Sequence, residues 1–248
     1  MPANFGQWET LHPDEIEAIV SAAPVAYLPL GTFEHHGWHL PICFDAIKAH
    51  RLCLLAARRT GGVVMPAFYY GTGGGHSDFK WTIILPENVI RPVISATIER
   101  LVLFGFKVVV LVTGHYPPEQ VQMVHELAAE AGARFPQARF IGLTEPEITT
   151  PLPGDAYPGD HAAKYETSIA LALEPEWVKW ENLRPGRDPA RVTLPHTPRG
   201  AGTLILDPDH PLYAIYGEDP RRTASRALGD QLVNEIVDRL VDLVGQPG

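Results

Sequence analysis

The stretch Lys107-Val-Val-Val-Leu-Val-Thr113 decides the fold class of this chain. It is apolar at almost every position, which is typical of a strand that other elements cover on both faces. Further short runs rich in Val, Ile and Leu alternate with segments of helical periodicity along the chain. This alternation is typical of β-α-β units, and it predicts an α/β fold with a mainly parallel sheet.

Working outward from this strand, the same periodicity predicts an element for most of the chain. We expect further strands at residues 25–30, 63–65 and 140–143. We expect helices at residues 13–21, 45–59, 92–104, 119–133, 166–173 and 224–244. In the third of these, Pro92 would lie in the first turn, where its missing N–H does no harm. Stretches rich in Pro and Gly, at residues 145–160 and 175–216, are expected to be loops.

The bulk composition narrows the class of protein. The 248 residues show no internal repeat, so we expect a single domain over residues 1–248. The formal net charge of −9 argues against nucleic acid as a partner, because that contact depends on Lys and Arg. No apolar run approaches the roughly 20 residues of a membrane span, and the first residues lack the basic and apolar regions of a signal peptide. With two cysteines and no disulfide framework, we expect a cytoplasmic protein.

Candidate metal ligands are concentrated directly after the predicted strand at residues 25–30. Residues 31–45 read Gly-Thr-Phe-Glu-His-His-Gly-Trp-His-Leu-Pro-Ile-Cys-Phe-Asp. Imidazole and carboxylate groups are the ligands that hold zinc, manganese and related divalent ions. This segment contains five of them: Glu34, His35, His36, His39 and Asp45. Packing gives no reason to gather them at a strand end, so the segment is the strongest indication of function in the chain.

Two further polar clusters follow at similar places in the chain. Thr113-Gly114-His115-Tyr116 follows the Val-rich strand, and Asp160-His161 and Glu166 lead into a predicted helix. Ligands of open parallel sheets bind at the carboxyl ends of the strands, so the first two clusters are expected on one edge of the sheet. A carboxylate such as Asp45 can bridge two ions that together activate a water. A nearby histidine outside the ligand set, such as His161, could then transfer protons.

Structural explanations compete with this interpretation for each residue taken alone. A single histidine at a strand end is usually a hydrogen-bonded part of the fold, and Glu166 near a helix start would stabilise the helix N-terminus. Glu-His-His is not the helical His-Glu-x-x-His pattern of zinc proteases. The Gly-rich residues 70–78 lack the Gly-Lys-Ser/Thr ending of a phosphate-binding loop. An active-site loop that brings His76 to the substrate explains them better.

The three clusters together resemble the signatures of the creatininase (creatinine amidohydrolase) family. Gly31-x-x-Glu34-x-His36-Gly37-x-His39-Leu40-Pro41-x-x-x-Asp45 resembles its first motif. Thr113-Gly114-His115 resembles its second, usually Asn-Gly-His, and Asp160-His161 followed by Glu166-Thr167-Ser168 resembles its third. Order and spacing agree from about residue 25 to residue 175.

This resemblance implies a layered α/β/α fold and a metal-dependent hydrolase of amide or cyclic-amide bonds. It implies two divalent ions per subunit, zinc or manganese, and a homo-oligomer, commonly a hexamer. By position, Glu34, Asp45 and His115 would bind one ion. His36 and the bridging Asp45 would bind the other, and His161 would be the acid/base residue.

The chain departs from the family pattern on the substrate side. Creatinine-hydrolysing members carry a glutamate two residues after the histidine of the second motif, where it ligates the second ion, and this chain has Pro117 there. Glu166 is the natural substitute and Glu119 a weaker one. These departures argue against creatinine itself as the substrate. The candidate substrate-binding residues are Trp38, His39, His76, Lys80 and Tyr116.

The sequence therefore predicts a hydrolase that uses a metal-activated water on a small polar substrate, most simply at a C–N amide bond. One alternative is hydrolytic ring opening of a cyclic ketone or a sugar-like substrate on the same metal site. The other alternative is a catalytically inactive metal-binding protein with a role in assembly or regulation, because Pro117 leaves one ligand position without a side-chain donor.

Overall fold

Five parallel strands form the central sheet in a computed structural model, which describes residues 4–155, 157–184, 206–207 and 209–246. The strands are β1 (Phe5–Gln7), β2 (Val25–Leu30), β3 (Gly62–Val64), β4 (Val108–Thr113) and β5 (Arg139–Thr144). Their order across the sheet is β1-β3-β2-β4-β5, and each neighbouring pair is parallel. The predicted parallel α/β sheet is confirmed, with β1 as an additional edge strand.

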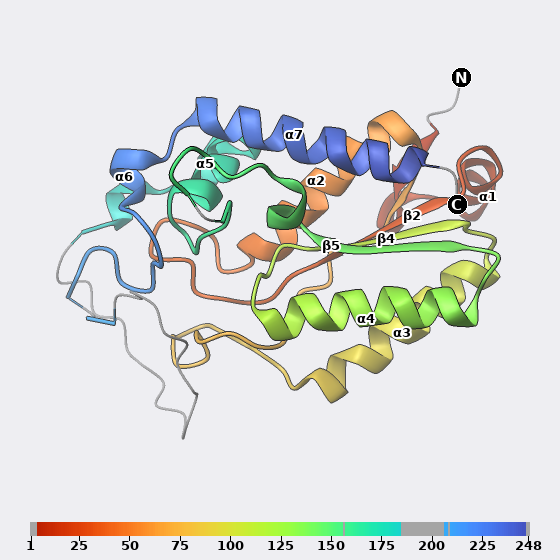
Figure 1. The fold of residues 1–248 in the computed structure, drawn as a ribbon, viewed down its shortest axis with the longest axis horizontal. Helices are drawn as coiled ribbons and strands as arrows, with labels where there is room; N and C mark the ends of the chain where they lie inside the picture. The colour runs from red at the N-terminus through yellow and green to blue at the C-terminus, as the bar shows by residue number, and fades with distance from the viewer. Residues whose placement is uncertain (1–3, 156, 185–205, 208, 247–248) are drawn as a thin grey trace.

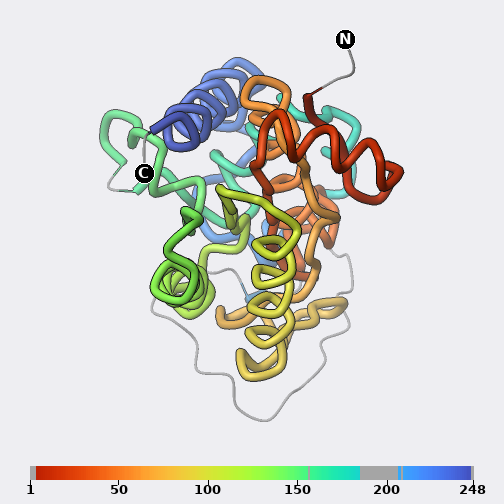
Figure 2. Tube along the Cα trace, turned by 90° about the vertical axis from the view of Figure 1, so that its right-hand side faces the viewer, coloured from red at the N-terminus to blue at the C-terminus, as the bar shows by residue number. Residues whose placement is uncertain are grey.

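Helices cover both faces of this sheet, as Figures 1 and 2 show from two directions. The α-helices are α1 (Pro13–Ala22), α2 (Phe44–Thr60), α3 (Glu87–Leu103), α4 (Pro118–Arg134), α5 (Lys164–Leu173), α6 (Pro220–Thr223) and α7 (Arg226–Gly245). Short 3-10 helices lie at Trp8–Thr10, Glu145–Ile148, Pro175–Trp177 and Trp180–Asn182. Helices α2, α5 and α7 lie on one face, and α3 and α4 lie on the other. Among the described residues, no helix is both long and apolar enough to span a bilayer.

Alternate residues of the central strands supply two separate cores. Tyr27 and Val110 belong to the core under α2, α5 and α7, whereas Leu28 and Leu111 belong to the core over α3 and α4. Successive side chains of a strand point to opposite faces, so a strand buried on both faces must be apolar throughout. This explains why the run at residues 107–113 contains so few polar residues.

Two of the sequence-based expectations need correction or completion. Helix α3 begins at Glu87, five residues before the expected start, so Pro92 lies inside the helix rather than at its first position. A proline there removes one backbone hydrogen bond of the helix. Burial of the apolar face formed by Ile90, Ile94 and Ile98 compensates for this loss. Of the second predicted loop, residues 185–205 and 208 lie outside the described residues.

The topology places the ends of β2 and β4 next to each other. Leu30 pairs with Thr113 in the register of the two strands. From β2 the chain runs through α2 to β3 on one side, and from β4 it runs through α4 to β5 on the other side. Open α/β sheets bind ligands where the connections diverge in this way. The loops that follow the strands gather at this end of the molecule, on the left in Figure 1.

Two glycines let the start of α2 approach these strand ends. A Cβ atom on Gly31 would lie 2.3 Å from the backbone nitrogen of Ala46, and one on Gly114 would lie 2.2 Å from the carbonyl oxygen of Asp45. Both contacts are with backbone atoms, which cannot rotate away. The glycines at these positions therefore allow Asp45 to come close to the segment after β4 that carries His115.

Gly114→Ala is expected to destabilise the fold by about 1–3 kcal/mol, the usual range for overpacking a tight site. For a chain of this size, each kcal/mol lowers the melting temperature by about 2–4 °C. Gly75→Ala is the matched control, because no atom lies within 4 Å of a Cβ placed there. Thermal unfolding of the two variants beside the parent measures the difference, and equal melting temperatures for both variants would refute the close approach.

Candidate metal centre

The predicted ligands of the first two motifs form one buried cluster at the ends of β2 and β4. Nδ1 of His115 lies 2.9 Å from Oε2 of Glu34 and 3.1 Å from Oδ2 of Asp45. Nε2 of His36 lies 2.9 Å from Oδ1 of Asp45. None of these four side chains is more than 2% exposed. The structure thus brings together residues that are far apart in the sequence.

Among the described residues, three groups of side chains could hold an ion, and two of them share Asp45. Glu34, Asp45 and His115 form one of these two, and His36, Asp45 and Glu166 form the other; the third group is Glu34, His36 and His161. Within each group the candidate ligand atoms lie within 4.8 Å of one another. One carboxylate oxygen of Asp45 faces His36 and the other faces His115, which is the orientation that a bridging carboxylate needs.

Glu166, in the first turn of α5, lies beside the candidate ligands. Its Oε2 atom lies 3.5 Å from Nε2 of His36 and accepts a hydrogen bond of 2.8 Å from the backbone N–H of Ala162. Glu119, the weaker candidate, is exposed, and its carboxylate lies against Gly73. The structure therefore places Glu166, and not Glu119, beside the other ligands.

The hydrogen bonds around the cluster fit a metal site. Nδ1 of His36 lies 3.0 Å from the carbonyl oxygen of Glu34 and donates its N–H there, so Nε2, which faces Asp45, is the nitrogen that could bind an ion after losing its proton. Nε2 of His115 is buried and has no hydrogen bond among the described residues. Buried polar atoms rarely lack a hydrogen-bond partner. Nitrogen and oxygen donors of this kind suit zinc or manganese.

The electrostatics of the cluster are dominated by its carboxylates. Burial by itself lowers the pKa of His115, but Glu34 and Asp45 outweigh it and raise that pKa to about 10. Burial also opposes protonation of His36, whose pKa is nevertheless raised to about 9 by Asp45 and Glu166. Asp45 stays ionised, because the two imidazoles overcome the effect of burial and lower its pKa to about 2. A buried cluster of ionised carboxylates attracts cations.

His161, the predicted acid/base residue, lies beside this cluster in a defined tautomer. Its Nε2 atom is 2.8 Å from the carbonyl oxygen of His35, so Nε2 carries the proton and Nδ1 is an acceptor. The ring lies between those of His36 and His76, at centroid distances of 4.3 and 4.0 Å. Burial and these two neighbours hold the pKa of His161 well below its usual range. The ring is therefore neutral, and its Nδ1 has a free lone pair.

A cavity of 540 Å³ opens beside the cluster, and two of the predicted substrate-binding residues line it. His76 and Tyr116 both form part of its wall. Nδ1 of His76 lies 2.8 Å from Oε1 of Glu34, so the Gly-rich loop does bring a histidine to the centre. The cavity is also lined by His161, Glu166, Tyr157 and Tyr216.

The other three predicted substrate-binding residues do not line this cavity, which corrects the expectation. The chain turns at Gly37, with φ of 60°, and after it Trp38 is partly buried and His39 is buried. Trp38 packs edge-on against His35, and Nε2 of His39 lies 2.9 Å from the hydroxyl of Thr167. The ammonium group of Lys80 lies over the ring of Trp81, 4.5 Å from its centre.

Two charged residues that were not predicted from the sequence, Lys48 and Glu145, lie behind the cluster. Both are almost completely buried. The ammonium group of Lys48 donates to Oε1 of Glu166 at 2.7 Å and to the hydroxyl of Tyr116, and it lies 3.9 Å from Oε1 of Glu145. The available signal was position, because Lys48 lies one helical turn after Asp45 on the buried side of α2, and Glu145 directly follows β5.

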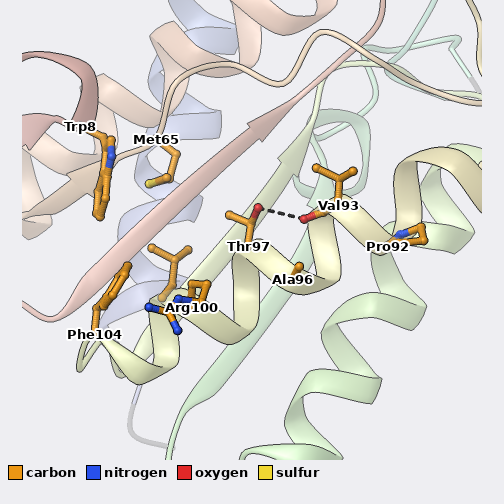
Figure 3. A pocket seen from close by; sticks show the side chains of 9 residues that line it. Trp8, Met65, Pro92, Val93, Ala96, Thr97, Arg100 and Phe104 are labelled. Atoms are coloured by element: carbon orange, nitrogen blue, oxygen red, sulfur yellow. Dashed lines mark hydrogen bonds between the residues drawn. The ribbon is translucent and has the colours of Figure 1, made fainter.

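A second hollow, of 520 Å³, lies on the outer side of α3 (Figure 3). It is lined mainly by apolar side chains, including Trp8, Met65 and Phe104. Its polar groups are engaged nearby: the Thr97 hydroxyl donates to the carbonyl of Val93, and Arg100 lies over the ring of Phe104. Lacking a cluster of titratable groups, this hollow is not a candidate active site.

Comparisons with known proteins agree on one family. The family model described as creatininase, creatinine amidohydrolase, matches residues 9–244. A creatinine amidohydrolase of Pseudomonas putida is 25% identical over 93% of this chain and 92% of its own length. A mycofactocin precursor peptide peptidase of Mycobacterium tuberculosis (strain CDC 1551 / Oshkosh) is 27% identical over 92% of this chain and 88% of its own length.

A solved structure with the same architecture supports this assignment. The structure described as "Creatininase Mn" superposes with a TM-score of 0.74 at 26% sequence identity, and the match covers 96% of both chains. The family model, the relatives and the fold therefore agree over nearly the whole length of the chain. The chain belongs to the creatininase family.

Proposed function

We propose that this protein is a metal-dependent hydrolase that cleaves a C–N amide bond in a small polar substrate. The observation that carries this proposal is the pair of three-residue ligand groups that share Asp45 next to a cavity of 540 Å³. The neutral ring of His161 on the cavity wall adds a proton acceptor to the same site. Membership of a family described as creatinine amidohydrolase supports the reaction class.

Two divalent ions fit the residues of the centre, and we propose manganese or zinc. Glu34, Asp45 and His115 would hold one ion, and His36, Asp45 and Glu166 would hold the other. The solved structure described as "Creatininase Mn" supports manganese. When bound, such ions lower the pKa of a water molecule and polarise the carbonyl group of a substrate.

The side chains around the cavity supply the remaining chemistry. Nδ1 of His161 can take a proton from the attacking water and return it to the leaving nitrogen. The hydrogen bond from its Nε2 to the carbonyl of His35 fixes the tautomer and stabilises the ring while it carries the extra proton. Nδ1 of His76 lies 2.8 Å from Oε1 of Glu34 at the cavity wall, which would hold that ligand in place.

A peptide is the second candidate substrate, because a second hollow lies next to the cavity. This hollow of 230 Å³ shares four lining residues with it: Tyr157, Gly159, Asp160 and Tyr216. A relative named as a peptide peptidase supports this candidate. A homo-oligomer such as a hexamer and a cytoplasmic location stay predictions.

An activity screen tests the proposal. The purified protein, supplied with Mn²⁺ or Zn²⁺, is assayed against cyclic amides, formamides, short peptides and cyclic ketones. We expect metal-dependent turnover of at least one amide class and its loss in Glu34→Gln. Glu119→Gln is the matched control, because this exposed glutamate lies near the site but outside both ligand groups.

The outcomes of the screen separate the candidate functions. Turnover that survives chelation and Glu34→Gln would refute the metal mechanism. Turnover of cyclic ketones alone would favour ring opening at a carbon–carbon bond over amide hydrolysis. Two bound ions with no turnover of any class would favour the metal-binding protein without catalysis.

A further inference from the structure

We propose that Lys48 is a positioning residue of the metal centre, whose buried ammonium group holds Glu166 and Tyr116 in their working orientations. The proposal rests on the metal site proposed above. Lys48 does not line the cavity, so it would act through these two neighbours rather than on the substrate.

The surroundings of Lys48 show that its ammonium group is the link between three segments. It lies on α2, hydrogen-bonds Glu166 on α5 and Tyr116 in the loop after β4, and has Glu145 at 3.9 Å. The side chain is fully buried, and its Cε would lie 3.1 Å from a Cβ on Gly114. With such close packing, the ammonium group has little freedom to leave these partners.

Lys48 determines which oxygen of Glu166 faces the ligand group. Its ammonium group takes Oε1 at 2.7 Å. The other oxygen, Oε2, receives the backbone N–H of Ala162 and lies 3.5 Å from Nε2 of His36. Glu166 is therefore held from one side and presents a single oxygen towards His36. The ammonium group also lies between the buried carboxylates of Glu166 and Glu145. Without it, no lysine charge would separate these two carboxylates.

Lys48 also determines the direction of the Tyr116 hydroxyl proton. An ammonium group has three donors and no lone pair, so the tyrosine oxygen must accept the bond from Lys48. The tyrosine O–H is then directed away from Lys48. Because Tyr116 lines the cavity, fixing its hydroxyl also fixes part of the cavity wall.

Two opposite effects on the second ion position make the proposal testable. A positive charge beside Glu166 repels a cation, so a purely electrostatic role predicts tighter metal binding when the charge is removed. A positioning role predicts weaker binding, because Glu166 loses the hydrogen bond that orients it. A merely structural salt bridge would change stability and leave the affinity for the second ion unaltered.

The experiment is a titration of metal-free protein with Mn²⁺ against a competing chelator. In Lys48→Met, we expect the second ion to bind at least about tenfold more weakly, as expected for the loss of a hydrogen bond between charged groups. Lys48→Gln keeps a shorter donor, so its loss should be smaller. The first ion, held by Glu34, Asp45 and His115, should bind as in the parent. Lys164→Met is the matched control, because it removes another lysine–carboxylate bond, to Asp155 at 2.6 Å.

The outcomes of the titration separate the positioning role of Lys48 from the existence of the metal centre. If the parent binds two ions and both Lys48 variants bind the second as tightly or more tightly, the positioning role is refuted and the metal centre stands. If the parent binds no Mn²⁺, the proposed metal centre is refuted, and the positioning role with it. If Lys48→Met does not fold, Lys48→Gln decides by the same criterion. Combining Lys48→Gln with Glu166→Gln should add no further loss, because Lys48 would act on this ion through Glu166.

Discussion

Asp45→Ala is expected to empty both ion positions and to abolish turnover. Its two carboxylate oxygens face different ligand groups, one towards His36 and one towards His115. Removing the shared ligand leaves each group with two side chains, too few for the three protein ligands that a catalytic zinc site usually needs. Metal analysis after dialysis should find less than half an ion per chain, beside undetectable activity.

Asp14→Ala is the matched control for this variant. Asp14 also lies in the first turn of a helix, α1, but it is exposed and outside the ligand groups. Circular dichroism must show that metal-free Asp45→Ala is folded, because the change also takes a buried partner from His36 and His115. Two ions retained in folded Asp45→Ala would contradict the shared-ligand arrangement.

His161→Ala is expected to lower turnover by about 10²–10⁴-fold, the usual contribution of a positioned acid or base. Metal content should stay near that of the parent, because His161 is assigned to proton transfer. Its backbone exchanges two hydrogen bonds with Tyr216, of 2.9 and 3.0 Å, and alanine can keep both. Turnover and metal content are measured on the same preparation.

The control for this variant is His125→Ala, an exposed histidine whose partner is Glu147. It should leave both turnover and metal content unchanged. A loss of metal in His161→Ala would instead make His161 a ligand, a role that its proximity to Glu34 and His36 permits. Unchanged turnover would exclude it from proton transfer.

The sequence predicts the central strands of this fold well, because their burial on both faces leaves a continuous apolar run. The segment at residues 25–30 matches β2 in full, and the run at 107–113 matches β4 to within one residue. The edge strand Phe5–Gln7 escapes prediction, since three residues carry no periodic signal. Pro92 misleads for a similar reason, because a proline usually marks a helix start and here lies in an interior stabilised by tertiary packing.

The candidate ligands could be proposed because parallel strands bring their carboxyl ends together whatever the sequence separation. Lys48 could not be predicted as part of the site, because lysine is rarely buried. Only the three-dimensional arrangement shows the carboxylates that compensate its charge. Trp38 and His39 were expected at the substrate because spacing alone does not show which way the chain turns at Gly37.

The number of metal ions bound per chain tests the central claim most directly. The parent protein is made metal-free, reconstituted with Mn²⁺, freed of excess metal and analysed for metal against protein concentration. The two ligand groups sharing Asp45 predict close to two ions per chain. One ion per chain would contradict the paired site, and none would contradict a metal centre at the ends of β2 and β4.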